Sequence, residues 1–185
     1  MRVITGSARG KKLKTLEGND VRPTSDKVKE AIFSIIQFDV PGASVLDLFA
    51  GSVQLGIEAL SRGASHCVFV DKSASSIAVV KENVNSTGFM KSSRILNMDS
   101  IDYLKTAKSG LDIALLDPPY RMGLLEKALP LLCPKMNDGG IVVCEHETGL
   151  LLPDEVEEFK LLKIYKYGNI SVTTYMKNPP VDEEE

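Results

Sequence analysis

The fold is decided by the stretch Val45-Leu46-Asp47-Leu48-Phe49-Ala50-Gly51-Ser52-Val53-Gln54-Leu55-Gly56. An apolar run, typical of a buried strand, leads into a turn of small residues and then into a helix. The helix is predicted to reach Arg62 and to stop at Gly63, with apolar residues spaced to face a sheet. Small residues let a ligand approach the backbone, and a helix N-terminus favours a negative group. The stretch therefore predicts a nucleotide-type binding loop.

Two acidic residues beside this loop indicate which nucleotide it binds. Asp71 ends the next apolar run, where a carboxylate can accept hydrogen bonds from both ribose hydroxyls. Asp47 ends the first run, where it would repel a pyrophosphate but attract the cationic methionine part of S-adenosylmethionine. Val53 also replaces the middle glycine of a dinucleotide-binding loop. We therefore expect S-adenosylmethionine as the cofactor; the alternative for Asp47 is a turn carboxylate that caps the next helix.

Strands and helices are predicted to alternate along most of the chain, which is typical of parallel strands with crossover helices. Near the C-terminus, two strand patterns are separated by Gly168-Asn169, a hairpin signal. The expected fold is α/β, a three-layer Rossmann-like fold with a mostly parallel seven-stranded sheet and an antiparallel edge hairpin. The expected strands are 44–49, 66–71, 94–97, 111–117, 140–145, 161–167 and 170–176. Helices are expected at 55–62, 73–87, 100–108, 124–133 and 154–159, and an amphipathic one over 28–36.

The tetrapeptide Asp117-Pro118-Pro119-Tyr120 matches what methyl transfer to an amino group requires. An exocyclic amine on a base is a weak nucleophile, so a site must accept its N–H protons and hold the ring. Asp117 can supply one acceptor, and the Pro118 carbonyl a second, because Pro119 forces the residue before it into an extended conformation. Tyr120 can stack on the base. The alternative is a strand-ending turn, which Asp and Pro both favour.

With both segments in hand, the chain resembles the bacterial 16S rRNA (guanine-N2)-methyltransferase family, within the Rossmann-like S-adenosylmethionine-dependent methyltransferases. The resemblance rests on 1–6 with 9–13, on 22–30, on 46–62 and on 117–120, and it covers nearly the whole length. It implies transfer to N2 of a flipped guanine in 16S rRNA, with Asp117, Pro118, Pro119 and Tyr120 as the catalytic residues. The candidate donor-binding residues are Asp47, Phe49, Ala50, Gly51, Ser52, Asp71, Lys72, Met98, Asp99 and Ser100. No metal is implied.

Asp99 and Val53 each affect how the donor would be held. Asp99 ends the third parallel strand, where it can read the donor's adenine or cap a helix. Val53 departs from the family pattern, which usually has glycine there, and a β-branched residue narrows both the allowed backbone angles and the room for the donor.

Three other functions stay open: an amino methyltransferase for adenine N6 or protein glutamine, a dinucleotide oxidoreductase, and an RNA-binding scaffold whose donor site has decayed.

The N-terminal segment concentrates positive charge. Residues 1–36 carry a net charge of +4, whereas the rest of the chain carries −7. Phosphate neutralisation is local, so an acidic protein can still bind RNA through such a segment. We expect 1–24 to form a basic hairpin or mobile arm; the alternative is a solvated basic face. The candidate RNA contacts are Arg9, Lys11, Lys12, Arg22 and Thr24, of which Thr24 is also the expected N-cap of the following helix.

Length and composition fit one domain spanning 1–185, because 185 residues and 43% hydrophobic content suffice for a single core. The three cysteines lie apart in apolar stretches, so buried free thiols are expected. The sequence shows neither an apolar run of membrane-spanning length nor a leader. We expect a cytoplasmic monomer that acts on 16S rRNA or the small ribosomal subunit, away from membranes, with a disordered acidic tail over 178–185.

Overall fold

The computed structural model describes residues 1–16, 26–51 and 55–177. Five predicted features lie outside these residues: the candidate contacts Arg22 and Thr24, the loop residues Ser52 and Val53, and the acidic tail. The helices are α1 (Asp26–Ile35), α2 (Leu55–Ser61), α3 (Ala74–Thr87), α4 (Ser100–Thr106) and α5 (Leu124–Leu132), with 3₁₀ turns η1 (Met90–Ser92) and η2 (Cys133–Lys135). The strands are β1 (Ser44–Asp47), β2 (His66–Asp71), β3 (Ser93–Asn97), β4 (Leu111–Leu116), β5 (Met136–Glu147), β6 (Glu155–Val156), β7 (Phe159–Tyr167) and β8 (Ile170–Lys177).

The strands form one eight-stranded sheet in the order β3-β2-β1-β4-β5-β8-β7-β6. The first five strands in this order run parallel, and β8, β7 and β6 are added antiparallel. The chain moves outward from β1 to β3 on one side and from β4 to β5 on the other. This reversal creates a switch point between β1 and β4, and open α/β sheets bind ligands at the carboxyl ends of the strands there.

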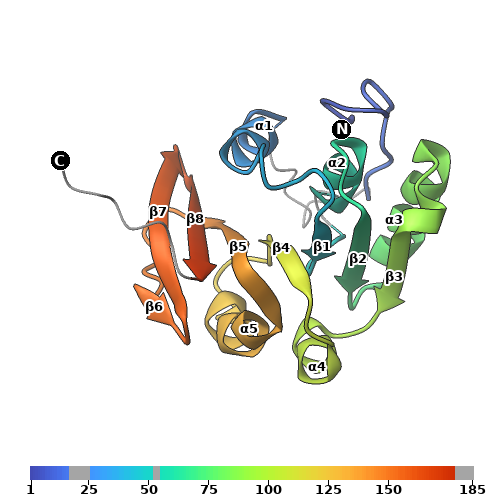
Figure 1. The fold of residues 1–185 in the computed structure, drawn as a ribbon. Helices are drawn as coiled ribbons and strands as arrows, with labels where there is room; N and C mark the ends of the chain where they lie inside the picture. Colours follow the sequence, from blue (N-terminus) through green and yellow to red (C-terminus); the bar gives the residue numbers. More distant parts are fainter. Residues whose placement is uncertain (17–25, 52–54, 178–185) are drawn as a thin grey trace.

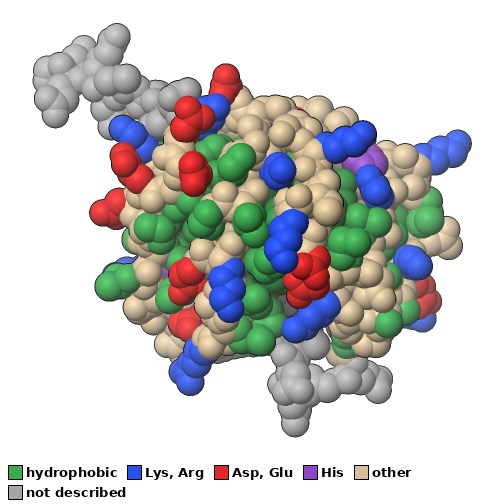
Figure 2. Space-filling view, turned by 90° about the horizontal axis from the view of Figure 1, so that it is seen from below, with side chains coloured by type: hydrophobic (Ala, Val, Ile, Leu, Met, Phe, Trp, Pro, Cys, Tyr) green, Lys and Arg blue, Asp and Glu red, His purple; other side chains and the backbone are tan. Residues whose placement is uncertain are grey.

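Helices cover both faces of the sheet (Figure 1). On the face covered by α1, α2 and α3, here called the α1 face, Phe33 and Ile57 pack with Phe69 of β2. On the other, called the α5 face, Leu104 of α4 and Leu129 of α5 pack with sheet residues. The three-layer Rossmann-like prediction is confirmed. Figure 2, seen from the side of α4 and α5, shows basic, acidic and apolar side chains interspersed over that face.

The segment 154–159, predicted as a helix, is instead a small hairpin, and this prediction was wrong. Val156 of β6 pairs with Phe159 of β7, and both side chains are buried. Glu157, between the two strands, has φ of 54° and makes a tight turn. Pairing with β7 buries both apolar residues, which a lone short helix could not do without a partner surface. The sheet therefore has eight strands rather than seven.

The N-terminal residues form a compact hairpin-like segment packed on α2 and α3. Arg2 and Lys12 form an antiparallel bridge, and Val3 and Leu13 are buried. The carboxylate of Glu58 on α2 accepts hydrogen bonds from the backbone N–H groups of Ile4 and Thr5, at 2.8 and 3.0 Å. The segment is thus attached to the helix that follows the predicted donor loop. Within the described ranges, no helix has the length and apolar character of a membrane span.

Candidate active site

The predicted site residues follow the carboxyl ends of the parallel strands. Asp47 ends β1, Asp71 ends β2, and Asp99 follows β3. Asp117 follows β4, and Glu145, which was not among the predicted residues, lies near the end of β5. Because these strands are parallel and adjacent, their carboxyl ends meet at one edge of the sheet. Residues separated along the sequence are therefore brought to a common edge.

Asp47 is a buried carboxylate at the start of the loop. It is 3% exposed, and its Oδ2 accepts a hydrogen bond of 2.7 Å from the backbone N–H of Gly56 in α2. The pKa of Asp47 is raised to about 7, mainly because the carboxyl is buried; the Gly56 hydrogen bond opposes this shift, and the nearby charge of Asp71 adds to it. The helix-capping interpretation of Asp47 is thus realised in the structure, and the same buried acid is also suited to attract a cation.

Asp71 organises the loop from the end of β2. Its Oδ2 accepts from the N–H of Gly51 at 2.9 Å, and its Oδ1 accepts from the N–H of Ser73 at 2.8 Å. A Cβ atom at Gly51 would lie 2.5 Å from the Ser76 side chain and 2.6 Å from Asp71 Oδ2. Only glycine permits this approach of loop to carboxylate. A carboxylate has about four acceptor positions, so Asp71 retains capacity for ribose hydroxyls.

The segment after β3 is held by side chain to backbone hydrogen bonds. Asp99 is the N-cap of α4, and its Oδ1 accepts from the N–H groups of Ile101 and Asp102 at 2.9 and 3.2 Å. Ser100 is buried and donates to the Leu48 carbonyl at 3.0 Å. Met98 is 41% exposed. The capping interpretation of Asp99 is confirmed, and Met98 presents an apolar side chain beside it.

Asn97 is a site residue that the sequence reasoning missed. Its Nδ2 donates to the carbonyls of Asp71 and Lys72, at 3.0 Å each. These bonds fix the backbone of the two predicted donor-binding residues at the end of β2. The signal available in the sequence was an asparagine at the end of the strand that follows Asp71-Lys72. Its side-chain amide can donate to backbone carbonyls that have no hydrogen-bond partner in the sheet.

The tetrapeptide lies between β4 and α5. Asp117 and Tyr120 are partly exposed, Pro118 is buried, and Pro119 is exposed. The Tyr120 hydroxyl donates to Oε1 of Glu145 at 3.3 Å, and Glu145 is 2% exposed. Glu145 was also missed, although an acidic residue that follows the apolar run 141–144 is an unusual choice for a buried strand. The structure joins the tetrapeptide to β5 through this pair.

The basic residues of the N-terminal segment divide into exposed and buried ones. Arg9, Lys11 and Lys12 are exposed, and Lys11 Nζ donates to the Ser86 carbonyl of α3 at 2.8 Å. Lys29, counted in the basic total, is instead 1% exposed and donates to the Arg2 carbonyl at 2.6 Å. Burial lowers the pKa of Lys29, and the charge of Glu58 opposes that effect. Lys29 therefore stabilises the N-terminal segment and is withheld from solvent.

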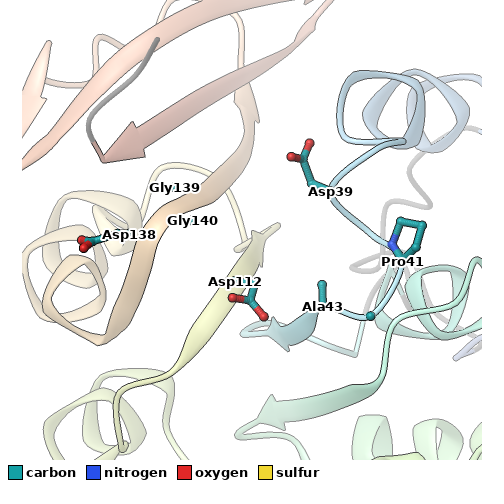
Figure 3. Close-up of a pocket in the computed structure, with 8 residues that line it drawn as sticks. Asp39, Pro41, Ala43, Asp112, Asp138, Gly139 and Gly140 are labelled. Atoms are coloured by element: carbon teal, nitrogen blue, oxygen red, sulfur yellow. The ribbon is translucent and has the colours of Figure 1, made fainter.

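A cavity of about 290 Å³ lies at the opposite edge of the sheet, at the amino ends of β1 and β4 (Figure 3). Asp112, in its lining, accepts from the Ser44 N–H at 2.8 Å and from Asn137 Nδ2 at 2.7 Å. Asp138, also in the lining, forms a salt bridge with Lys177. These carboxylates stabilise loops and strand starts. Across the part of the chain that the structure describes, no group of three His, Cys, Asp or Glu residues is arranged to hold a metal.

The three cysteines, Cys67, Cys133 and Cys144, are buried free thiols, as predicted. Burial raises the pKa of each, to about 12 for Cys133. None is therefore a thiolate near neutral pH.

Comparisons with known proteins agree with the geometry of the site. The family model described as conserved hypothetical protein 95 matches residues 1–176. YlbH of Bacillus subtilis (strain 168), provisionally named an rRNA methyltransferase, is 40% identical over 182 residues, covering 96% of this chain and 99% of YlbH. Ribosomal RNA small subunit methyltransferase D of Haemophilus influenzae is 34% identical, covering 95% and 93% of the two chains.

A solved structure agrees. The protein yhhF from Escherichia coli, provisionally named a methyltransferase, superposes with a TM-score of 0.87 at 28% identity, covering 96% of this chain and 97% of that one. The fold and the loop at its switch point define a methyltransferase of the Rossmann-like class. Within that class, the chain belongs to the conserved hypothetical protein 95 family.

Proposed function

We propose that this protein transfers a methyl group from S-adenosylmethionine to the exocyclic N2 of a guanine in 16S rRNA. The observation that carries the proposal is the placement of Asp117 and Tyr120 after β4, beside the Asp47 loop of β1, at the switch point of the sheet. Family membership and the ribosomal RNA methyltransferase names of the relatives support the same conclusion. The protein acts in the cytoplasm as a monomer.

The residues at the ends of β1, β2 and β3 fit S-adenosylmethionine. Gly51 has no Cβ to overlap Asp71, so the loop backbone can lie against the carboxylate that would hold the ribose. Asp71 would hold the ribose hydroxyls, with Lys72 beside it. Asp47 would face the cationic amino-acid part, with Phe49, Ala50 and Ser52 completing the loop. Met98, Asp99 and Ser100 would border the adenine.

The methyl donor supplies an electrophilic methyl group, and the protein's task is to align the amine. Asp117 and the Pro118 carbonyl accept hydrogen bonds from the two N–H groups of the guanine amine, while Tyr120 stacks on the ring. Transfer would break the methyl–sulfur bond of the donor, which would leave as a neutral thioether, while positive charge would develop on the nitrogen and both acceptors would stabilise it. The released proton passes to water. An amine inside an intact helix cannot reach such a site, so the guanine must be unpaired or flipped.

The RNA is held by the N-terminal segment. Arg9, Lys11 and Lys12 are exposed and basic, and Arg22 and Thr24 continue the segment in the sequence. Phosphate contacts position the substrate without reading its sequence. The names of the relatives support the small ribosomal subunit or its 16S rRNA as the partner.

The test is transfer of a labelled methyl group from S-adenosylmethionine to 16S rRNA and to 30S particles from cells that lack the enzyme. The RNA is then digested to nucleosides. Labelled N2-methylguanosine is the expected product. Labelled N6-methyladenosine would move the assignment to adenine, and donor binding without labelled RNA would move it to a protein or DNA amine. Absence of both label and donor binding would leave the RNA-binding scaffold.

A further inference from the structure

Strands β7 and β8 carry an excess of positive charge. Residues 159–177, which form β7, its turn and β8, contain four lysines and no acidic residue, although the whole chain has a net charge of −3. Lys160 and Lys177 form salt bridges with acidic neighbours. Lys163 and Lys166 are exposed, and within the described ranges no salt bridge involves either of them. Their charge is available to a negative partner.

Strand register decides which side of the sheet each β7 residue occupies. Tyr165 pairs with Val172 of β8, and Val172 pairs with Glu145 of β5. Paired residues project to the same side, so Tyr165 lies on the same side of the sheet as Glu145. Tyr167 follows on that side, two residues along β7. Both tyrosines pack partly against the α1-face core and remain partly exposed.

Lys163 joins the two tyrosines on this side. The register shift between Leu161 and Lys163 pairs Lys163 with Thr174, which pairs with the α1-face residue Val143. Lys163 Nζ lies 5.2 Å from the centroid of the Tyr165 ring. Lys163, Tyr165 and Tyr167 therefore form one surface, here called the β7 strip. Lys166 pairs with Ser171 and projects to the other side.

The β7 strip lies near the candidate base site. Glu145, which accepts the Tyr120 hydroxyl, is two strands away from Tyr165. Adjacent strands are spaced by about 4.8 Å, which places the two rows about 10 Å apart. β7 runs in the same direction as β5, so Tyr167 lies toward the carboxyl edge. Figure 1 shows β7 near the outer end of the sheet, beyond α1.

We propose that the β7 strip is a second RNA contact, which holds unpaired nucleotides that flank the target guanine. This inference rests on the proposed function. Bases stack on aromatic side chains while ammonium groups neutralise phosphates, and partly exposed tyrosines beside a lysine provide both contacts. The flipped or unpaired guanine requires flanking nucleotides that are not fully stacked in a helix, which is the form of RNA that such a surface binds.

Lys163→Gln and Lys166→Gln are a matched pair, because both remove an exposed charge from the same strand on opposite sides. The wild-type protein and both variants are compared for binding to in vitro transcribed 16S rRNA by filter retention, at several salt concentrations. Methyl transfer to 30S particles that lack the modification is measured as KM and kcat. Lys163→Gln should weaken transcript binding about fivefold at low salt and reduce the salt slope by roughly 0.7 to 0.9, with kcat unchanged. Lys166→Gln should remain within about twofold of wild type.

A second pair tests stacking. Tyr165→Leu keeps an apolar side chain against the core but removes the ring, and should raise the KM for RNA about fivefold. Tyr165→Phe keeps the ring and should have the KM of the wild type. Equal effects of Lys163→Gln and Lys166→Gln, or equal effects of the two Tyr165 variants, would overturn the inference. If Lys163→Gln raised the KM for 30S particles but left binding to the free transcript unchanged, the strip would contact a ribosomal protein and not RNA. Absence of transfer by the wild type would refute the proposed function itself.

Discussion

The two halves of the candidate site are built differently. In the donor half, at the ends of β1, β2 and β3, the three aspartates Asp47, Asp71 and Asp99 each accept hydrogen bonds from backbone N–H groups. In the base half, after β4 and near the end of β5, Tyr120 is joined to Glu145 through their side chains. The donor half is thus shaped through loop backbone, and the base half through side chains that the sheet brings together.

This difference predicts separable losses of function. A change in the donor half should alter the loop and weaken binding of the cofactor. A change in the base half should leave the cofactor bound and slow the transfer. The following variants test that separation, from the largest expected effect to the smallest.

Asp117→Ala should reduce kcat by roughly a thousandfold, because it removes an acceptor that orients the amine and stabilises the charge that develops on it. Affinity for S-adenosylmethionine, measured by isothermal titration, should change little. Asp71→Ala is the matching donor-half variant and should weaken that affinity. Equal loss of donor affinity in both variants would contradict the separation of the two halves.

Gly51→Ala should weaken donor affinity by tens of fold and destabilise the protein by about 1 to 3 kcal/mol, because the added Cβ would overlap Ser76 and the Asp71 carboxylate. Isothermal titration and thermal unfolding measure the two effects. Binding of 16S rRNA serves as the control and should be unchanged. A variant with normal donor affinity would show that the loop does not need the close approach seen at Gly51.

Asp47 should make donor affinity depend on pH. Its folded-state pKa is raised from 3.8 to about 7, so the folded protein binds a proton more tightly than the unfolded chain. The stability of the free protein should therefore fall as pH rises from about 4 to about 7. A cationic donor favours the ionised form, so its Kd should decrease about tenfold between pH 6 and pH 8.

Asp47→Asn is the control for this pH dependence. It removes the titrating group while retaining an oxygen that can accept from the Gly56 N–H. Its donor affinity should be lower at pH 8 and nearly independent of pH. A pH dependence as steep as that of the wild type would assign the titration to another group.

Glu145→Gln should reduce kcat by about threefold or less, because the amide oxygen can still accept from the Tyr120 hydroxyl. Glu145→Ala removes the acceptor and should cost about tenfold in kcat, with donor affinity unchanged. Thermal unfolding of both variants separates positioning of Tyr120 from a loss of stability. If both variants had the same kcat at equal stability, Glu145 would not position the Tyr120 ring.

The sequence correctly predicted the fold class and the family. The strand 66–71 and the hairpin around Gly168-Asn169 were predicted from local patterns, since the alternation of strand and helix and the turn residues are short-range signals. The wrong helix over 154–159 shows the limit of such signals. Val156 and Phe159 could fit either pattern, and only the presence of β7 made pairing the more favourable outcome.

The candidate site residues remain predictions, but the structure adds partners that local pattern could not supply. Asn97 fixes the backbone at Asp71, and Glu145 accepts from Tyr120. Lys29, which was counted in the net charge of residues 1–36, is buried against the Arg2 carbonyl. Charge counted along a sequence does not reveal which side chains face solvent.

By itself, the sequence determined the strand before Gly51, the helix that begins at Leu55 and the acids that end the strands, and it predicted a role in methyl transfer for Asp117 to Tyr120. Each depends on residues close together in the chain, whose backbone preferences act locally. Only the tertiary structure decided that Glu145 meets Tyr120, that Lys29 is buried, and that Lys163, Tyr165 and Tyr167 share a side with the site. Those placements follow from strand order and register, which are set by burial of the whole core.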